Sequence, residues 1–226
     1  MSKFFLVNRF GIQFAMLLAL LLVYPLIQSS RFGDVIADIV FSLVLLSGIY
    51  IAAGERKRKK LYAIALALAV PAFTVRWLEY LPIAWSAREL FEDVFGIVFL
   101  VFTLAVIVSH LTRTESVTSD TIYGAMCAYL LVGLTFSLVY ELIYRLDNRA
   151  FWVTESQLLS GGSPDFSLWV YFSFITLTTL GYGDVYPVLP WSRVICALEA
   201  IVGQLYVAVL IASLVGINAG SKHRSR

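Results

Sequence analysis

The sequence predicts an all-α membrane protein with six transmembrane helices and one short helix that enters the membrane without crossing it. Hydrophobic residues make up 60% of the 226 residues and charged residues only 14%, whereas soluble domains contain about 45–50% and about 25%. A helix needs roughly 20 mostly apolar residues to cross the hydrocarbon of a bilayer. Runs that approach this length occur six times, at Phe10–Gln28, Val35–Ala53, Leu61–Trp77, Phe91–His110, Ile122–Tyr144 and Val194–Asn218.

The first and third runs have weaknesses as transmembrane helices. Lys3 and Arg9 precede the first run, as in a signal peptide, but the run is long for that role and "LIQSS" lacks a small-residue cleavage site. We expect a retained helix, with a cleaved signal peptide as the alternative. Pro71 interrupts the third run, which a membrane helix tolerates when neighbouring groups satisfy the freed carbonyl.

The basic residues predict the orientation, because Lys and Arg concentrate in short cytoplasmic loops. Residues 54–60 (GERKRKK) contain five of them and the tail SKHRSR three more, whereas residues 78–93 contain four acidic residues and one Arg. We therefore expect a multi-pass protein of the plasma membrane (the inner membrane of a bacterium), with both termini in the cytoplasm and the acidic loop outside.

Charge and side-chain chemistry argue against several functions. The net charge of +2 gives no support for a nucleic-acid partner. Cys127 and Cys196 lie in separate apolar runs without a CxxC spacing, and His110 and His223 form no recognisable metal or catalytic pair. We expect neither an enzyme nor a bound cofactor.

The short helix lies within SGGSPDFSLWVYFSFITLTT, residues 160–179. Ser163 is predicted as its N-cap, Pro164 as its first helical residue, and Asp165 as an acidic residue of the first turn. Phe166–Thr178 would be about 20 Å long, which is too short to span the bilayer. The helix would end inside the membrane with a partial negative charge, which favours a cation.

The next residues form a polar stretch, TLTTLGYGD, at residues 176–184. Non-helical backbone is tolerated at membrane depth only where it is buried in protein or lines water. Carbonyls that all face one axis require residues of alternating handedness, and left-handed geometry is cheap only for glycine. Gly181 and Gly183 fit that requirement, so we expect stacked oxygens, including the Thr179 hydroxyl, that suit a monovalent cation.

This stretch resembles the selectivity filter of potassium channels, whose TxTTxGYGD pattern it matches without a gap. The resemblance extends from Ile122 to Asn218 and implies an outer helix, a turret, a pore helix, a filter and an inner helix. It implies that Tyr171 donates a hydrogen bond to Asp184 at the outer mouth. The implied K+ ligands are Thr179, Leu180, Gly181, Tyr182 and Gly183, with filter support from Thr178, Asp184 and Tyr171.

The chain departs from voltage-gated members of that family. Tyr171 and Phe172 stand where those channels usually carry two tryptophans, and aromatic packing is the alternative role for this pair. Leu180 replaces the commoner valine, which leaves the finer ion preference open. The run Phe91–His110 contains no Lys or Arg, whereas a voltage sensor moves about 3–4 charges per subunit. Strong voltage gating is therefore not expected.

Three further residues are candidates for gating. Gly203 follows Gly183 by 20 residues, the spacing of a hinge glycine in many potassium channels, and the alternative is a glycine that permits close packing. Glu141 and Glu199 are acids within apolar runs, which makes each a functional hypothesis. The alternative is that both reach the headgroups or hydrogen-bond to neighbouring helices.

We expect residues 1–120 to form a four-helix peripheral domain, 121–220 the pore domain and 221–226 a basic cytoplasmic tail. One filter segment per chain implies a homotetramer in the lipid bilayer. With eight residues after Asn218, gating would reside in the membrane part or in an unidentified regulatory partner, and the lack of long loops favours a prokaryotic source. The alternatives to a potassium channel are a non-conducting or regulatory channel subunit and a component of a potassium transporter.

Overall fold

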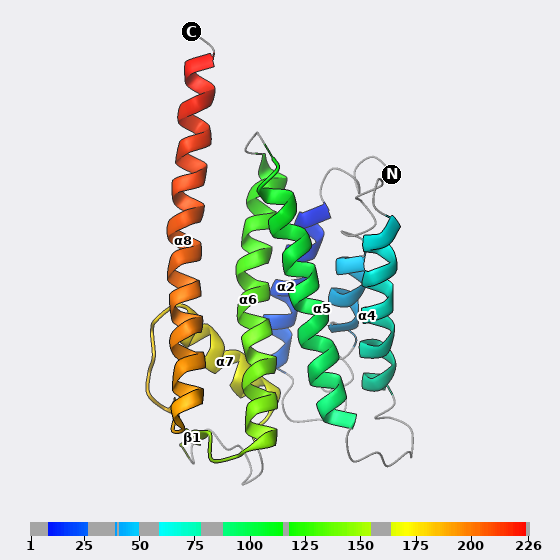
Figure 1. The fold of residues 1–226 in the computed structure, drawn as a ribbon, viewed down its shortest axis with the longest axis vertical. Helices are drawn as coiled ribbons and strands as arrows, with labels where there is room; N and C mark the ends of the chain where they lie inside the picture. The colour runs from blue at the N-terminus through cyan, green and yellow to red at the C-terminus, as the bar shows by residue number, and fades with distance from the viewer. Residues whose placement is uncertain are drawn as a thin grey trace.

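The computed structural model describes residues 9–26, 39, 41–49, 59–77, 88–114, 118–154 and 164–224. Helices form most of these residues, and a two-stranded ribbon lies at one end of the molecule (Figure 1). Residues 41–49 are also helical. The elements are α2 (Arg9–Leu26), α4 (Lys59–Trp77), α5 (Arg88–Leu111), α6 (Ser119–Leu146), β1 (Phe151–Val153), α7 (Phe166–Leu177), β2 (Val185–Pro187) and α8 (Pro190–Arg224).

Three helices of the described residues are long and apolar enough to cross a membrane. They contain the fourth, fifth and sixth of the predicted runs. The first and third runs overlap shorter apolar segments, Phe10–Leu22 of α2 and Leu61–Val75 of α4. Of the second run, only residue 39 and residues 41–49 lie within the described part. The predicted count of six spans therefore stays a prediction. The three long apolar stretches are Glu89–Leu111, Ser119–Leu146 and Pro190–Leu210.

The long helices form a bundle, with α7 placed between α6 and α8 at one end (Figure 1). The main apolar core joins α2, α5 and α6, where Phe10, Leu17, Phe99, Ile107 and Leu131 are fully buried. The start of α2 and the end of α8 lie towards the same end of the bundle, and α8 continues beyond α5 and α6. The side of α8 that no described helix covers is largely exposed.

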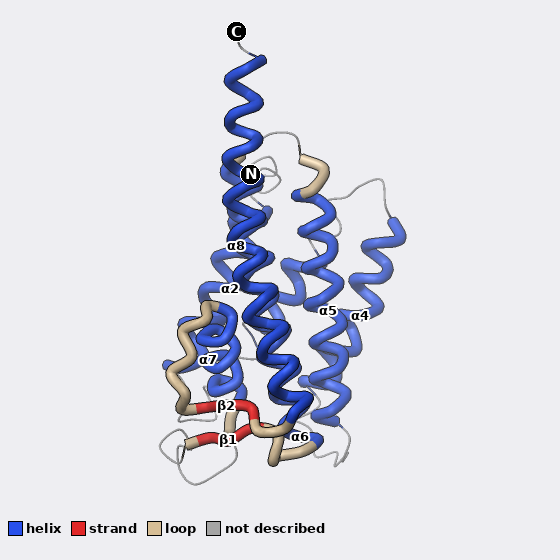
Figure 2. Tube along the Cα trace, turned by 60° about the vertical axis from the view of Figure 1, so that its left-hand side comes forward, coloured by secondary structure: helices blue, strands red, loops and turns tan. Residues whose placement is uncertain are grey.

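The ribbon joins the two ends of the segment that contains α7 (Figure 2). β1 follows α6, β2 precedes α8, and the two strands pair antiparallel with Phe151 opposite Pro187 and Val153 opposite Val185. Both strands carry aromatic residues, which favour strands. The rings of Trp152 and Tyr186 stack across the pair with their centroids 5.0 Å apart.

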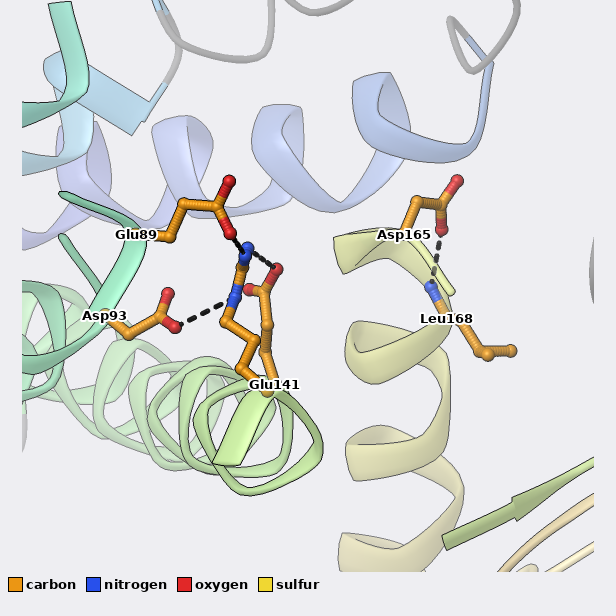
Figure 3. Close-up of polar contacts among 6 residues, drawn as sticks. Glu89, Asp93, Glu141, Asp165 and Leu168 are labelled. Atoms are coloured by element: carbon orange, nitrogen blue, oxygen red, sulfur yellow. Dashed lines mark hydrogen bonds and ion pairs between the residues drawn. The ribbon is translucent and has the colours of Figure 1, made fainter. Parts of the chain in front are cut away.

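The start of α7 corrects the predicted cap. Asp165, not Ser163, is the N-cap residue, and Phe166 is the first helical residue in place of Pro164. The Asp165 carboxylate accepts a hydrogen bond from the Leu168 backbone N–H at 3.1 Å (Figure 3). An acidic N-cap both satisfies a free N–H and carries a charge that suits the helix dipole. Ser163 itself lies outside the described residues.

Candidate functional site

The chain leaves α7 through a tight, hydrogen-bonded turn. Thr178 is the C-cap, and its N–H and hydroxyl both donate to the Phe174 carbonyl, at 3.1 and 2.6 Å. The N–H groups of Leu180 and Gly181 both donate to the Ile175 carbonyl, at 2.8 and 3.1 Å. Carbonyls at a helix end need partners other than the helix itself. Here the first residues of the polar stretch supply them.

The backbone after α7 alternates in handedness. Thr179, Gly181 and Gly183 have φ angles of 59°, 52° and 82°. Thr179 is the one non-glycine residue with positive φ in the described part of the chain, so Leu180 and Tyr182 between them have negative φ. An ordinary strand directs successive carbonyls to opposite sides. Alternation of handedness instead turns them towards one side.

Positions 181 and 183 require glycine because of their backbone conformation, and not because a Cβ would clash with neighbouring atoms. Apart from the residues directly adjacent in the chain, no heavy atom of the described residues lies within 4 Å of a Cβ built on Gly181 or Gly183. Their positive φ values, however, are ones that L-residues with a Cβ adopt at a cost of roughly 1–2 kcal/mol. The spacing of the two glycines was the signal that identified them in the sequence.

Thr179 extends the alternation one step further than the glycines. A non-glycine residue held in this region costs of order 1–3 kcal/mol and persists only where its surroundings hold it. Its N–H donates to the Thr176 carbonyl at 2.9 Å and its hydroxyl to the Thr178 carbonyl at 2.7 Å. The left-handed geometry of Thr179 was not predicted, although its position two residues before Gly181 is the signal that indicates it.

Asp184 is held at the far end of the stretch by two other segments. The Tyr171 hydroxyl donates to its carboxylate at 2.7 Å, which is the contact that the resemblance to potassium channels implied. The Asp184 carbonyl accepts from both the N–H and the hydroxyl of Thr154, at 3.1 and 2.8 Å. Thr154 follows β1 and was missed in the sequence, because the pairing that brings it to Asp184 spans 30 residues.

The side chains of the stretch are largely exposed within one chain. Tyr182 is 68% exposed and Leu180 is 56% exposed. The Tyr182 ring lies nearly parallel to the Tyr171 ring, at 7° with the centroids 6.5 Å apart. A single chain therefore leaves more than half of each of these two large side chains exposed.

Phe172 belongs to an aromatic core behind the stretch. Its ring lies 4.9 Å from that of Tyr140 on α6 and 5.6 Å from that of Phe151 on β1, measured between centroids. Its side chain is buried. The structure thus places Phe172 in aromatic packing and Tyr171 on Asp184, so the two neighbours act differently.

Glu199 and Glu141 lie in separate clusters. Glu199 is fully buried on α8, accepts a hydrogen bond from the Tyr140 hydroxyl at 2.5 Å and contacts the Ser173 hydroxyl on α7. It therefore hydrogen-bonds to neighbouring helices, as one of the two alternatives expected. These contacts join α8 to α6 and α7.

Glu141 belongs to an ion cluster between α5 and α6 (Figure 3). The Arg145 guanidinium lies 2.6 Å from the Glu141 carboxylate and also pairs with Glu89. The Arg145 Nε atom lies 3.1 Å from Oδ2 of the buried Asp93. This contact is an ion pair without hydrogen-bond geometry. Three carboxylates share one guanidinium, so this cluster links α5 to the end of α6.

Gly203 permits α8 to touch the end of α7. It is buried, and a Cβ placed there would overlap the Leu177 carbonyl oxygen and lie 2.9 Å from Leu177 Cδ1. This geometry gives Gly203 a packing role at the point where α7 ends. Close approach between helices in membranes depends on small residues of this kind.

Residues 125–218 match the model of a protein family described as ion channel. The match contains most of α6, all of α7 and the polar stretch, and most of α8, and it covers less than half of the chain. No curated protein in the comparison matches the chain. Together with the three long apolar helices, the match shows a membrane protein that contains an ion-channel domain.

Gly203→Ala should destabilise the protein by about 1–3 kcal/mol, because its methyl group would overlap a backbone atom that has no rotamer to relieve the clash. Thermal unfolding of the purified protein measures the effect. Ala197→Gly, at an exposed position of the same helix, is the control and should cost about 1 kcal/mol through helix propensity alone. A Gly203→Ala protein that unfolds at the wild-type temperature or above would contradict the packing role.

Thr154→Val should weaken the hold on Asp184, because it removes the hydroxyl bond and keeps the backbone N–H bond. A lost hydrogen bond of about 1 kcal/mol corresponds to a roughly five-fold shift towards states in which Asp184 is released. Ion currents from purified protein should therefore decay faster or show shorter openings. Thr154→Ser keeps the hydroxyl and should behave as wild type, and equal effects of both variants would exclude the hydrogen bond as the cause.

Proposed function

We propose that the chain is one subunit of a homotetrameric potassium channel that conducts K+ passively across the plasma membrane and is not strongly gated by voltage. One observation carries the proposal. At the end of a helix of 12 residues, about 18 Å long, the backbone alternates in handedness over Thr179, Gly181 and Gly183. That geometry, within an ion-channel domain, supports a pathway lined by backbone oxygens.

Backbone carbonyls suit a monovalent cation that must bind and then leave. Rings of carbonyl oxygens replace the hydration shell of K+ without the full charge of carboxylates. In the proposed filter these oxygens come from the residues between Thr179 and Gly183, with the Thr179 hydroxyl at the inner end. The C-terminal end of α7 points its partial negative charge towards this region, which favours a cation over an anion.

The surface of a single chain supports an assembly of four copies. One chain supplies one strand of oxygens, and a closed ring requires several copies around an axis. Leu180 and Tyr182 beside the strand are exposed, as is much of one side of α8. Burial of such side chains between subunits is favourable by about 25 cal/mol per Å² of apolar area. The large exposed side chains of α8 include Leu198, Ile201, Val202, Leu205 and Val209.

The charges of the chain support the proposed orientation and mode of gating. The basic residues of 54–60 and of the tail suit the cytoplasmic side, and the acidic residues of 78–93 suit the outside. The proposed filter then lies near the outer face. Between Phe91 and His110, α5 carries no Lys or Arg that a membrane potential would move.

Purified protein in liposomes should give a reversal potential close to that of K+ in opposed K+ and Na+ gradients. Absence of current from the wild-type protein would support a non-conducting subunit, and saturation of its flux at carrier-like rates would support a transporter component.

Gly181→Ala should abolish the selectivity or the current, because a Cβ at positive φ costs about 1–2 kcal/mol in every subunit. Gly220→Ala, a change of the same kind in the helical backbone near the end of α8, is the matched control. Unchanged selectivity in Gly181→Ala would contradict the filter assignment.

The current should depend only weakly on voltage. A charged fourth helix moves about 3–4 charges per subunit, and the corresponding helix here has no basic residue between Phe91 and His110. Steady-state activation curves from planar bilayers measure the effective charge. A steep curve equivalent to several charges would show that another part of the chain senses voltage.

A further inference from the structure

The carboxyl group of Glu199 lies where three helices of the channel domain meet. Glu199 is on α8, Tyr140 is on α6 and Ser173 is on α7, and all three side chains are fully buried. Within the described residues, no Lys or Arg forms an ion pair with Glu199. The titratable groups that face it are Tyr140 and Tyr129 of α6 and Cys196 of α8, and none of these carries a positive charge in either protonation state.

The hydrogen atoms available at this junction decide which group donates. The Ser173 hydroxyl has one hydrogen, and its oxygen lies 2.7 Å from the Gly133 carbonyl and in contact with Glu199 Oε1. A carbonyl can only accept, so the Ser173 hydrogen is used towards Gly133. The hydrogen between Ser173 and Glu199 must then come from the carboxyl group. The other carboxyl oxygen, Oε2, accepts from the Tyr140 hydroxyl at 2.5 Å.

The opposite assignment is less favourable. If Ser173 donated to a carboxylate, the lone pairs of its oxygen and of the Gly133 carbonyl would face each other at 2.7 Å. The carboxylate would also be a buried charge without a paired Lys or Arg among the described residues, in a helix that is long and apolar enough to cross a membrane. An ionised side chain at the centre of a membrane is unfavourable on every insertion scale.

We propose that Glu199 is held as the neutral carboxylic acid and that its proton, donated to Ser173, positions the pore helix α7 against α6 and α8. The chain of donors then runs from Tyr140 to Glu199, from Glu199 to Ser173, and from Ser173 to the Gly133 carbonyl, and every hydrogen is used once. Ser173 lies six residues before Thr179. Glu199 is therefore a positioning residue for the turn that begins the polar stretch, whichever ion the channel conducts.

Infrared spectroscopy of the purified protein tests the protonation state. The wild-type spectrum at neutral pH should contain a carboxylic-acid C=O stretching band that disappears in Glu199→Gln, whereas carboxylate bands should be unchanged between the two proteins. Loss of a carboxylate band instead of an acid band would overturn the proposal. Because this readout involves no ion flux, it remains decisive if the proposed potassium selectivity fails.

The variants at position 199 test the positioning role. Glutamine is the matched substitution, because its carbonyl accepts from Tyr140 and its amide N–H donates to Ser173 as the neutral acid does. Glu199→Gln should therefore keep the wild-type melting temperature and single-channel conductance. If the native group were a carboxylate, the amide would instead place a donor against the Ser173 hydrogen, and the protein would be destabilised.

Glu199→Ala should lower the melting temperature by several degrees and shorten channel openings, because it leaves Tyr140 and Ser173 without their buried partner. Ser173→Ala provides a second route to the same loss, since the Gly133 carbonyl keeps the Ser137 hydroxyl at 2.8 Å. It should shorten openings while the acid band of Glu199 shifts in frequency. Equal destabilisation by glutamine and alanine at position 199, or an unshifted band in Ser173→Ala, would overturn the proposal.

Discussion

The structure of the channel domain depends on one constraint, which is that backbone polar groups in hydrocarbon must find partners within the protein. α7 has 12 residues, too few to cross a membrane, so a membrane would leave its last carbonyls in hydrocarbon without hydrogen-bond partners. The N–H groups of Leu180 and Gly181 both donate to the Ile175 carbonyl, and the N–H and hydroxyl of Thr178 both donate to the Phe174 carbonyl. In the proposed filter, the carbonyls that follow are then left to face a cation.

Small residues on both sides bring α7 close enough for that arrangement. A Cβ at Gly133 on α6 would lie 2.7 Å from the Phe174 ring, and one at Gly203 on α8 would overlap the Leu177 carbonyl. The short distance to α6 places the Ser173 hydroxyl on the Gly133 carbonyl. Close packing and buried polar contacts therefore depend on each other, since neither glycine site leaves room for a larger side chain. Such contacts between membrane helices contribute up to about 2 kcal/mol each.

The lengths of the apolar runs predicted the helices of the channel domain well, because apolar runs in a membrane protein leave few alternatives to a helix. The contact from Tyr171 to Asp184 and the left-handed glycines also agree with what the sequence indicated.

The features that sequence reasoning missed or misplaced fall into two kinds. Some are local choices between equally good candidates, as with the N-cap of α7. Others, such as the contact of Thr154, depend on strand pairing between distant segments, for which three-residue strands give almost no pattern. Gly203 shows a further limit of sequence reasoning. A hinge and a close helix contact both require glycine, so the sequence alone does not distinguish these two roles.

The pairing of β1 with β2 also has a consequence for the entropy of the chain. Phe151 and Pro187 are joined across the ribbon, so α7 and the residues after it form a closed loop within each subunit. The cost of closing such a loop rises only slowly with its length, by about 0.6 kcal/mol for each doubling. With the strands paired, α7 and residues 178–184 have fewer conformations open to them within a single chain. In the proposed tetramer, part of the entropic cost of shaping the pore is therefore met when the monomer folds, before the subunits associate.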